Sequence, residues 1–372
     1  MKITAAVLDH VGAVGPFAHS KPLRLADVEL EAPRPGELLV RIDAAGLCHS
    51  DLSVVNGDRP RPTPMALGHE AAATVISAGA QDSAFQAGDR VVLAFLPACG
   101  ACVDCASGRG FLCPPAAAAN GAGAMLRGGR RLREGAEAVY HHLGVSAFAS
   151  HAVIDERSAV KVPADIKPEI AALFGCAVLT GVGAVFNTAA LRPGETVAVY
   201  GLDGVGLSCV LGALAAGAQS IIAIDPIAAK RDLALDLGAT AVMSPQEASE
   251  EIGVVAPGGV DVAVETAGRA DVLAAAYRAT RRGGRTVTVG LPNPSQMLSI
   301  PAVSLVGDAK TLIGSYMGSS IPRRDIPRYI ALWRSGRLPV ERLLTSVSPL
   351  SDINRLLDEL ASGAAIRQIV IP

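Results

Sequence analysis

The sequence predicts an α/β protein with a doubly wound parallel sheet and a second, β-rich domain. Up to about Cys176 the chain is irregular, with alternating strand-like segments punctuated by glycine and proline. Beyond that point apolar strands alternate with helices, which favours a parallel sheet covered on both faces. At 372 residues the chain is long enough for two domains.

The β-rich part is predicted from short runs of alternating apolar and polar residues. The predicted strands are Met1–Leu8, Glu37–Ala44, Ala71–Ala78 and Arg90–Phe95. We expect this β-rich domain to cover residues 1–177 and to include a small lobe near residues 97–115.

The second part repeats a strand-and-helix pattern. Its predicted strands are Glu195–Tyr200, Ser220–Ile224, Ala241–Met243, Val260–Glu265, Arg285–Gly290 and Thr311–Gly314, with helices over Leu207–Ala216 and Ile227–Leu237. A final strand, Arg367–Ile371, ends the tail. This second domain is expected to cover residues 178–315, and residues 316–372 are expected to return to the β-rich domain.

Composition excludes several classes of function. The net charge is -2 and no basic block is present, so nucleic-acid binding is not expected. Ile170–Leu191 and Gly204–Ile224 are uncharged and long enough to cross a bilayer. Both are rich in glycine and alanine, as buried α/β elements also are, so we expect no membrane span. The start of the chain does not resemble a signal peptide, which predicts a reducing, cytoplasmic location.

Six of the seven cysteines fall into two metal-like groups. The first is Cys99, Cys102, Cys105 and Cys113, whose four thiolates at short spacing can close a tetrahedron around Zn²⁺. Two disulfides or an iron–sulfur cluster are the alternatives, and a reducing compartment disfavours the disulfides. The seventh, Cys209, is predicted to be a core residue.

The second group is dispersed along the chain. Cys48 follows Gly46-Leu47, His69 stands in Gly68-His69-Glu70, and Cys176 follows Gly175. Two thiolates and one imidazole make a three-ligand zinc site with an open fourth position, the pattern that catalytic zinc requires.

A glycine turn predicts a dinucleotide site. Gly201-Leu202-Asp203-Gly204-Val205-Gly206 follows a strand and opens a helix, although Asp203 replaces the middle glycine of the usual pattern. We expect an acid there to crowd and repel the pyrophosphate. Asp225 lies 19 residues after Gly206, at the end of the next strand, where a carboxylate binds ribose hydroxyls and repels a 2′-phosphate. This favours NAD over NADP.

Together these motifs resemble the zinc-dependent alcohol dehydrogenases of the medium-chain dehydrogenase/reductase superfamily, nearly end to end. The resemblance implies a GroES-like catalytic domain and a Rossmann cofactor domain. It implies catalytic zinc on Cys48, His69 and Cys176, and structural zinc on the four clustered cysteines. Asp51 and Glu70 match acids that would orient His69 and tune the metal.

The resemblance also implies roles in cofactor binding and catalysis. Lys230 is similar to a lysine on the adenosine ribose, Arg367 to an arginine on the pyrophosphate, and His49 stands where many relatives have another phosphate-binding arginine. Ser50 matches the hydroxyl that bonds the alkoxide and starts a proton relay. Many relatives end that relay at a histidine, here Ser53, so the relay is expected to run through the ribose or His49.

For the substrate pocket the resemblance implies Phe95, His142 and Leu143, with Leu291 beside the nicotinamide. For His142 a packed or solvent-facing role stays open. The expected reaction interconverts small to medium primary alcohols, aliphatic or aromatic, and aldehydes.

Several alternatives remain. Glutathione-dependent formaldehyde dehydrogenase is one, although residues 116–119 are all alanine and offer no arginine for that substrate's carboxylates. A non-catalytic zinc-binding protein is another, whereas a polyol dehydrogenase is disfavoured by Cys176. We expect a homodimer, or a tetramer of two such dimers. The apolar segment Gln296–Val306 is taken as an edge strand that pairs with its copy across a two-fold axis.

Overall fold

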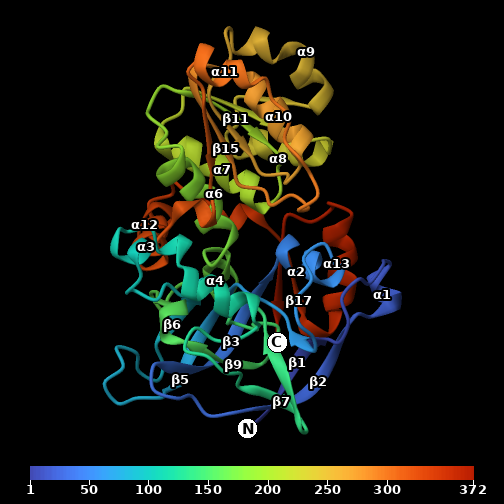
Figure 1. Ribbon diagram of the computed structural model, residues 1–372, viewed down its shortest axis with the longest axis vertical. Helices are drawn as coiled ribbons and strands as arrows, with labels where there is room; N and C mark the ends of the chain where they lie inside the picture. The colour runs from blue at the N-terminus through green and yellow to red at the C-terminus, as the bar shows by residue number, and fades with distance from the viewer. The chain divides into compact units, whose positions relative to one another are not determined.

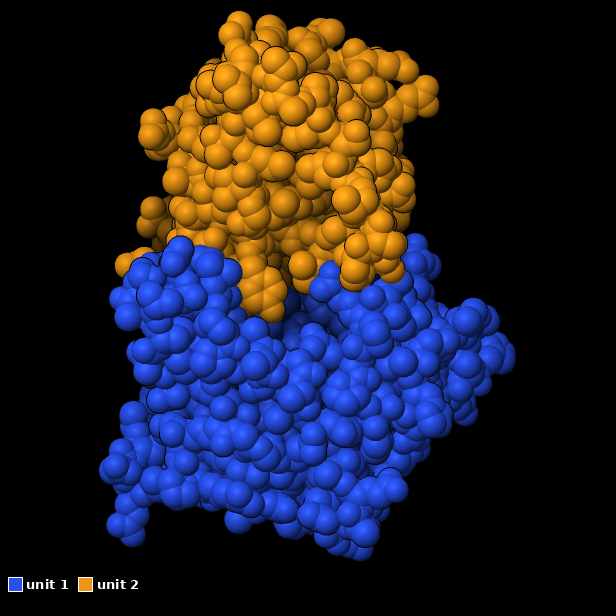
Figure 2. All heavy atoms as spheres, viewed as in Figure 1, with its two compact units in different colours: residues 1–176, 321–326, 344–372 blue, residues 177–320, 327–343 orange.

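The computed structural model describes all 372 residues and divides them into two compact units (Figures 1 and 2). Unit 1 contains Met1–Cys176, Ile321–Ile326 and Leu344–Pro372, and unit 2 contains Ala177–Ser320 and Pro327–Leu343. Residues 316–320 and 327–343 thus cluster with the cofactor unit, although the sequence analysis placed all of 316–372 in the catalytic domain. No helix is both long and apolar enough to cross a membrane.

Unit 1 is built from a small closed barrel and a seven-stranded sheet. The barrel joins β1 (Lys2–Leu8), β2 (Leu23–Leu30), β7 (Leu132–Glu134), β8 (Glu137–His141) and β4 (Met65–Ala66). The sheet runs in the order β10 (Ala159–Lys161), β6 (Arg90–Leu93), β5 (Ala71–Ala78), β3 (Glu37–Leu47), β18 (Arg367–Ile371) and β17 (Leu344–Pro349), and β9 (His151–Asp155) also pairs with β3.

The long strand β3 organises this sheet. It pairs antiparallel with β5, β9 and β18, so the C-terminal strand lies next to the end of β3 that carries Leu47. Apolar residues of these strands form one core, which the C-terminal helix α13 (Ile353–Ala361) joins through Ile353, Leu356, Leu357 and Leu360. This topology brings residues near 47, 70 and 367 together although they are far apart in the sequence.

Short helical segments complete unit 1. The helices are α1 (Phe17–Ser20), α2 (His49–Val55), α3 (Val103–Ala106), α4 (Pro114–Gly121) and α5 (Pro168–Leu173), with short turns η1 (Gly110–Leu112), η2 (Glu156–Ser158) and η6 (Leu350–Asp352). Helix α12 (Pro322–Arg334) contains the boundary between the units, and Pro327 lies inside it.

Unit 2 contains the parallel sheet that the sequence predicted. Its order is β13 (Ala241–Met243), β12 (Ser220–Ile224), β11 (Thr196–Tyr200), β14 (Val260–Glu265), β15 (Thr280–Thr288) and β16 (Thr311–Gly314), and every pair is parallel. The central strand β11 is almost wholly apolar and buried, as expected for a parallel strand covered on both faces.

Helices flank this sheet in Figure 1. Those that contact its strands are α7 (Gly204–Ala216), α8 (Ala228–Asp236), α9 (Pro245–Val255) and α10 (Ala270–Ala279). Unit 2 also contains α6 (Ala177–Gly183) and α11 (Ala302–Gly307), with η3 (Ala184–Thr188), η4 (Met317–Ser319) and η5 (Val340–Leu343). Glycine is required at the β11–α7 turn, because a Cβ on Gly206 would lie 1.8 Å from the carbonyl oxygen of Gly201.

The expectation of an edge strand within Gln296–Val306 is wrong. Residues 296–301 contain no strand, and α11 occupies most of the rest. The edge strand that follows this segment is β16, which the sequence predicted as a strand in its own right. Periodicity alone cannot assign a short apolar run to a helix or a strand, and this segment is too short for the helical period to show.

Candidate active site and cofactor site

Cys48, His69 and Cys176 converge in unit 1. Cys48 is the residue between β3 and α2 and is the N-cap of α2. His69 lies just before β5, and Cys176 follows α5. The potential ligand atoms of the three residues lie within 4.8 Å of one another, and all three residues are buried. The Nε2 of His69 is buried and has no hydrogen-bond partner. Such an orphaned nitrogen beside two thiols fits a metal ion bound by these three residues.

Asp51 sets the orientation of His69. Its Oδ1 lies 3.1 Å from His69 Nδ1, and its Oδ2 accepts a hydrogen bond from the backbone N–H of Cys48 at 3.1 Å. With Nδ1 held by a carboxylate, the imidazole presents Nε2 to the thiols. Asp51 therefore occupies the orienting position that the resemblance implied.

Charges in this cluster shift the pKa values of its members. Burial alone would raise the pKa of Asp51, but His69 and His142 together hold it well below its usual value. The hydrogen bond from Cys176, with a smaller contribution from His69, lowers the pKa of the Cys48 thiol. The cluster thus favours an ionised carboxylate and an ionised thiol, which are the protonation states of metal-site residues.

The structure gives Glu70 a partner other than His69, and its expected role in orienting that residue stays a prediction. Its Oε1 forms an ion pair with the guanidinium of Arg367 on β18. Both side chains are almost fully buried. Because Glu70 and Arg367 lie far apart in the sequence, local sequence patterns could not predict that they pair. The pairing of β18 with β3 brings them together.

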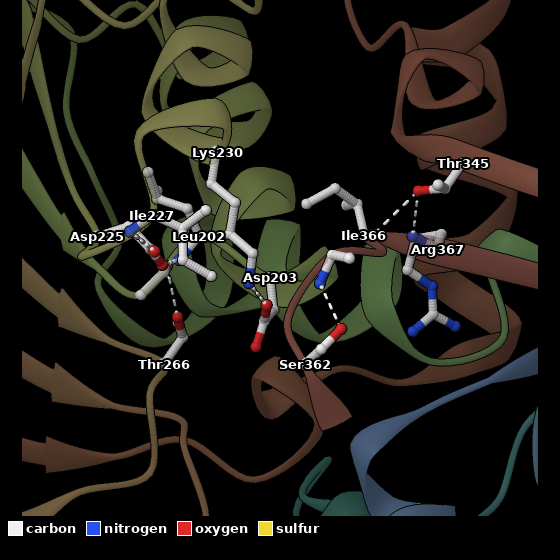
Figure 3. Close-up of polar contacts among 12 residues, drawn as sticks. Leu202, Asp203, Asp225, Ile227, Lys230, Thr266, Thr345, Ser362, Ile366 and Arg367 are labelled. Atoms are coloured by element: carbon white, nitrogen blue, oxygen red, sulfur yellow. Dashed lines mark hydrogen bonds and ion pairs between the residues drawn. The ribbon is translucent and has the colours of Figure 1, made fainter. Parts of the chain in front are cut away.

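Arg367 is consequently engaged by a carboxylate. The sequence analysis assigned this arginine to the pyrophosphate, but in this structure its guanidinium pairs with Glu70, and the backbone N–H of Arg367 donates to Thr345 Oγ1 at 3.2 Å (Figure 3). A contact with phosphate would need the guanidinium to share or leave Glu70.

The other predicted catalytic residues lie close by in α2. The Ser50 hydroxyl oxygen is 3.9 Å from Cys48 Sγ. Ser53 donates its hydroxyl to the carbonyl oxygen of Ser50 at 2.9 Å, so it is engaged within the helix. His49 is exposed at the first position of α2.

The predicted pocket residues of unit 1 border the same cluster. Phe95 packs edge-on against His69 with ring centroids 5.6 Å apart. His142 is buried, its ring is 5.4 Å from that of His69, and its Nδ1 is 3.2 Å from Asp51 Oδ1. A solvent-facing role for His142 is therefore wrong. Leu143 follows with a positive φ of 50° and is also buried.

The four clustered cysteines form a second candidate metal centre. All are free thiols, and their Sγ atoms lie within 4.8 Å of one another. Cys99 and Cys105 have sulfurs 4.0 Å apart, as do Cys102 and Cys113. A tetrahedral zinc ion with Zn–S bonds of about 2.3 Å separates its sulfurs by roughly 3.8 Å.

Backbone amides support this centre. The N–H groups of Ala101 and Cys102 donate to Cys99 Sγ and lower the pKa of that thiol to about 6. Cys113 Sγ accepts from the N–H of Cys99 at 3.2 Å. Amide donors directed at sulfur stabilise thiolates, so the lobe suits a cation held by four sulfurs.

In unit 2, the predicted cofactor residues gather at the carboxyl edge of the parallel sheet. The glycine turn follows β11, Asp225 follows β12 and Leu291 lies shortly beyond β15. Thr266, which the sequence analysis did not single out, follows β14 at the same edge. Thr266 Oγ1 donates to the carbonyl oxygen of Gly201 at 2.8 Å and holds the turn. Ligands of open parallel sheets bind outside this edge.

Asp225 is almost fully buried beside this turn. Its Oδ2 accepts from the N–H of Leu202 at 2.8 Å and its Oδ1 from the N–H of Ile227 at 2.9 Å (Figure 3). A carboxylate oxygen has a further lone pair, so these bonds are compatible with a ribose hydroxyl donating to either oxygen. Leu291 is 54% exposed on the same edge.

The outcome for Asp203 differs from the expectation of a bare acid facing the pyrophosphate. Asp203 forms an ion pair with Lys230, so the ammonium expected on the ribose and the acid expected to repel phosphate contact each other (Figure 3). The sequence showed each residue but not their pairing.

Comparisons with known proteins agree with this geometry. The family model for the alcohol dehydrogenase GroES-like domain matches residues 34–164, and that for zinc-binding dehydrogenase matches residues 204–335. The S-(hydroxymethyl)glutathione dehydrogenase of Synechocystis is 35% identical and the geraniol dehydrogenase of Castellaniella defragrans 36% identical. The alignments cover 100% of both chains in the first case, and 99% of this chain and 97% of the relative in the second.

A solved structure shows the same fold. The benzyl alcohol dehydrogenase of Acinetobacter calcoaceticus superposes with a TM-score of 0.92 at 30% identity, over 100% of this chain and 99% of that one. These likenesses define the class as oxidoreductase, with a GroES-like domain beside a Rossmann-like cofactor domain. The chain belongs to the zinc-dependent alcohol dehydrogenases of the medium-chain dehydrogenase/reductase superfamily.

Membership in the family establishes the coarse chemistry. The protein is an enzyme that uses zinc and a nicotinamide cofactor on small alcohols or aldehydes. The named relatives act on different alcohols, so the family leaves the substrate open.

Proposed function

We propose that this enzyme interconverts primary alcohols and aldehydes by hydride transfer to and from NAD, with one catalytic and one structural zinc ion per chain. The observation that carries the proposal is the buried, unpartnered His69 Nε2 beside the thiols of Cys48 and Cys176. Three such groups leave a fourth position for an alcohol oxygen. When bound, zinc lowers the pKa of the alcohol and the nicotinamide accepts the hydride.

The residues around this position have separable roles in the proposal. Ser50 accepts a hydrogen bond from the alcohol and passes its proton onward, since its hydroxyl lies beside Cys48. The next carrier is the ribose or the exposed His49, because Ser53 is engaged by the Ser50 carbonyl. Asp51 keeps His69 in the tautomer that presents Nε2. Phe95, Leu143 and His142 would form the walls around the substrate, and Leu291 would contact the nicotinamide.

The choice of NAD rests on Asp225. A buried carboxylate after the second strand accepts bonds from ribose hydroxyls and repels a 2′-phosphate. Gly201, Gly204, Val205 and Gly206 would hold the pyrophosphate at the first turn of α7, where backbone N–H groups point at the ligand.

The range of alcohols is proposed from the pocket residues and the relatives. Two relatives are named for geraniol and benzyl alcohol, which are primary alcohols of different shape. An apolar pocket wall would accommodate both alcohols. The Synechocystis relative is named for S-(hydroxymethyl)glutathione. An arginine that binds the carboxylates of that substrate would be expected at residues 116–119. These residues are instead four alanines within α4.

A homodimer is proposed as the assembly, with a tetramer as the larger alternative. The outer edge of β16 has no strand partner within the chain. Met297, Val303 and Val306, in the segment before β16, are 77–86% exposed, and apolar side chains exposed in this way favour an interface. Light scattering tests the assembly, and a mass near the 37.9 kDa chain mass at micromolar concentration would contradict it.

A substrate panel followed through NADH absorbance tests the function. The panel contains benzyl alcohol, geraniol, ethanol, a secondary alcohol and S-(hydroxymethyl)glutathione, each with NAD and with NADP. We expect the highest kcat/KM for a simple primary alcohol with NAD. Preference for the glutathione adduct would instead identify a formaldehyde dehydrogenase. Failure of the zinc-loaded enzyme to oxidise any member would support the non-catalytic alternative.

A further inference from the structure

Asp203 replaces the middle glycine of the turn, yet its backbone conformation does not require glycine and its side chain does not cap α7. Its φ of -74° suits any residue, so no glycine is required there. It is the N-cap residue of α7, yet its side chain makes no capping bond to the first-turn amides. The carboxylate is instead directed to the ammonium of Lys230 (Figure 3). The Asp203 side chain therefore leaves the backbone N–H groups of the first turn of α7 able to bind a phosphate.

Lys230 connects the two halves of the cofactor edge. It lies in the first turn of α8, just after Asp225, yet its Nζ reaches the turn before α7. Its side chain is only 7% exposed, whereas that of Asp203 is 39% exposed. The lysine stem is thus held against the protein and its charge is matched by one partner that faces solvent.

The neighbouring cation is also engaged. Arg231 donates to the carbonyl oxygens of Asp225 at 2.7 Å and Pro226 at 3.0 Å. Both cations at this end of the site therefore already have partners, Lys230 the Asp203 carboxylate and Arg231 two backbone carbonyl oxygens. A 2′-phosphate needs a nearby cation that is able to bind it.

We propose that Asp203 is a specificity-determining residue that excludes NADP by holding and neutralising Lys230. The inference rests on the proposed use of a dinucleotide at this edge and adds a second discriminating carboxylate to Asp225. With Asp203 charged, a 2′-phosphate meets a neutral ion pair and the Asp225 carboxylate. With Asp203 neutral, the ammonium of Lys230 loses its charged partner and becomes available to the added phosphate.

Binding of reduced cofactors to the zinc-loaded protein tests this inference, with dissociation constants measured from nicotinamide fluorescence. Asp203→Asn keeps the shape of the side chain and removes its charge. The expected result is that the ratio of the NADPH to the NADH dissociation constant falls by about tenfold. Adding Lys230→Met to Asp203→Asn is expected to restore most of the original ratio. Asp232→Asn removes an exposed charge from the same helix and should leave the ratio within about twofold of wild type.

The outcomes separate the inference from the proposed function. If Asp203→Asn strengthens NADH and NADPH equally, Asp203 acts on the shared pyrophosphate and the inference is wrong. If the ratio falls but Lys230→Met does not restore it, Lys230 is not the group released and the inference is also overturned. If wild type binds NADPH more tightly than NADH, the proposed NAD preference fails, while the change in ratio still decides the role of Asp203.

Discussion

Asp51 Oδ1 serves two imidazoles, lying 3.1 Å from His69 Nδ1 and 3.2 Å from His142 Nδ1. The same carboxylate also accepts from the backbone N–H groups of Cys48 and Gly68. It is fully buried, so each of these partners replaces water. The geometry makes Asp51 the residue through which His69 is oriented.

Asp51→Asn is expected to weaken zinc binding at Cys48, His69 and Cys176 by about 10- to 100-fold. The amide retains the size of the side chain but cannot accept from both His69 and the backbone in the same way. Competition with a chromophoric chelator measures the affinity. Asp27→Asn, on an exposed part of β2, should leave it unchanged. Equal affinities for wild type and Asp51→Asn would show that His69 does not depend on Asp51.

Gly46→Ala is expected to disrupt the ion pair between Glu70 and Arg367. A Cβ on Gly46 would lie 2.1 Å from Glu70 Oε1 and 2.9 Å from an Arg367 nitrogen, and both side chains are buried. We expect the free energy of unfolding to fall by about 1–3 kcal/mol, as measured by urea denaturation. Gly253→Ala is the matched control, since its Cβ meets nothing within 4 Å in helix α9. The free energy of unfolding of this control should rise by up to about 1 kcal/mol. A decrease comparable to that of Gly46→Ala would contradict the packing explanation.

Two zinc ions per chain, held by different ligand sets, should be found by elemental analysis. Cys176→Ser is expected to lose activity and about one zinc per chain while the protein stays folded, because an open catalytic site is not needed for the fold. Cys102→Ser should instead lower the free energy of unfolding by on the order of 2–5 kcal/mol, because the lobe loses the ion that joins its four sulfurs. One zinc or iron in wild type would refute the two-site arrangement.

Many strands and the grouping of the candidate zinc ligands could be predicted from the sequence because they depend on local sequence patterns. The strands Ala71–Ala78, Ser220–Ile224, Val260–Glu265 and Arg367–Ile371 have the predicted bounds, since buried apolar runs bounded by turns leave little freedom. The zinc ligands could be grouped because thiols at short spacing, or beside glycine, form distinctive patterns. Their convergence in unit 1 is a fact of the structure, and their role as ligands stays a prediction.

The pairings could not be predicted because they depend on tertiary contacts. Glu70 meets Arg367 only through the register of β18 on β3, and Lys230 meets Asp203 only because α8 returns to the turn before α7. In both cases a charged residue assigned to phosphate or metal by position is partnered by another charge. Local sequence gives the type of a side chain but not its partner.

The free energy of unfolding should depend on pH through His141, a buried residue outside both candidate metal centres. Burial, with a smaller effect of Arg131, lowers the pKa of His141 to about 4. Its Nε2 accepts a hydrogen bond from the backbone N–H of Arg131 at 3.0 Å, which requires an unprotonated nitrogen. In the unfolded chain the same imidazole titrates near its ordinary pKa of about 6.5.

The sign follows from this difference. Above about pH 6.5 the residue is neutral in both states and its contribution to stability is fully present. Between about pH 6.5 and 4 only the unfolded chain takes up the proton, so the free energy of unfolding falls as the pH falls, by up to about 3 kcal/mol. His141→Gln, whose amide oxygen can accept from Arg131, should therefore show a shallower decline over this range in urea denaturation. His19→Gln, an exposed change on α1, should decline like wild type. If His141→Gln and wild type decline in parallel, another group is responsible for the loss of stability in acid.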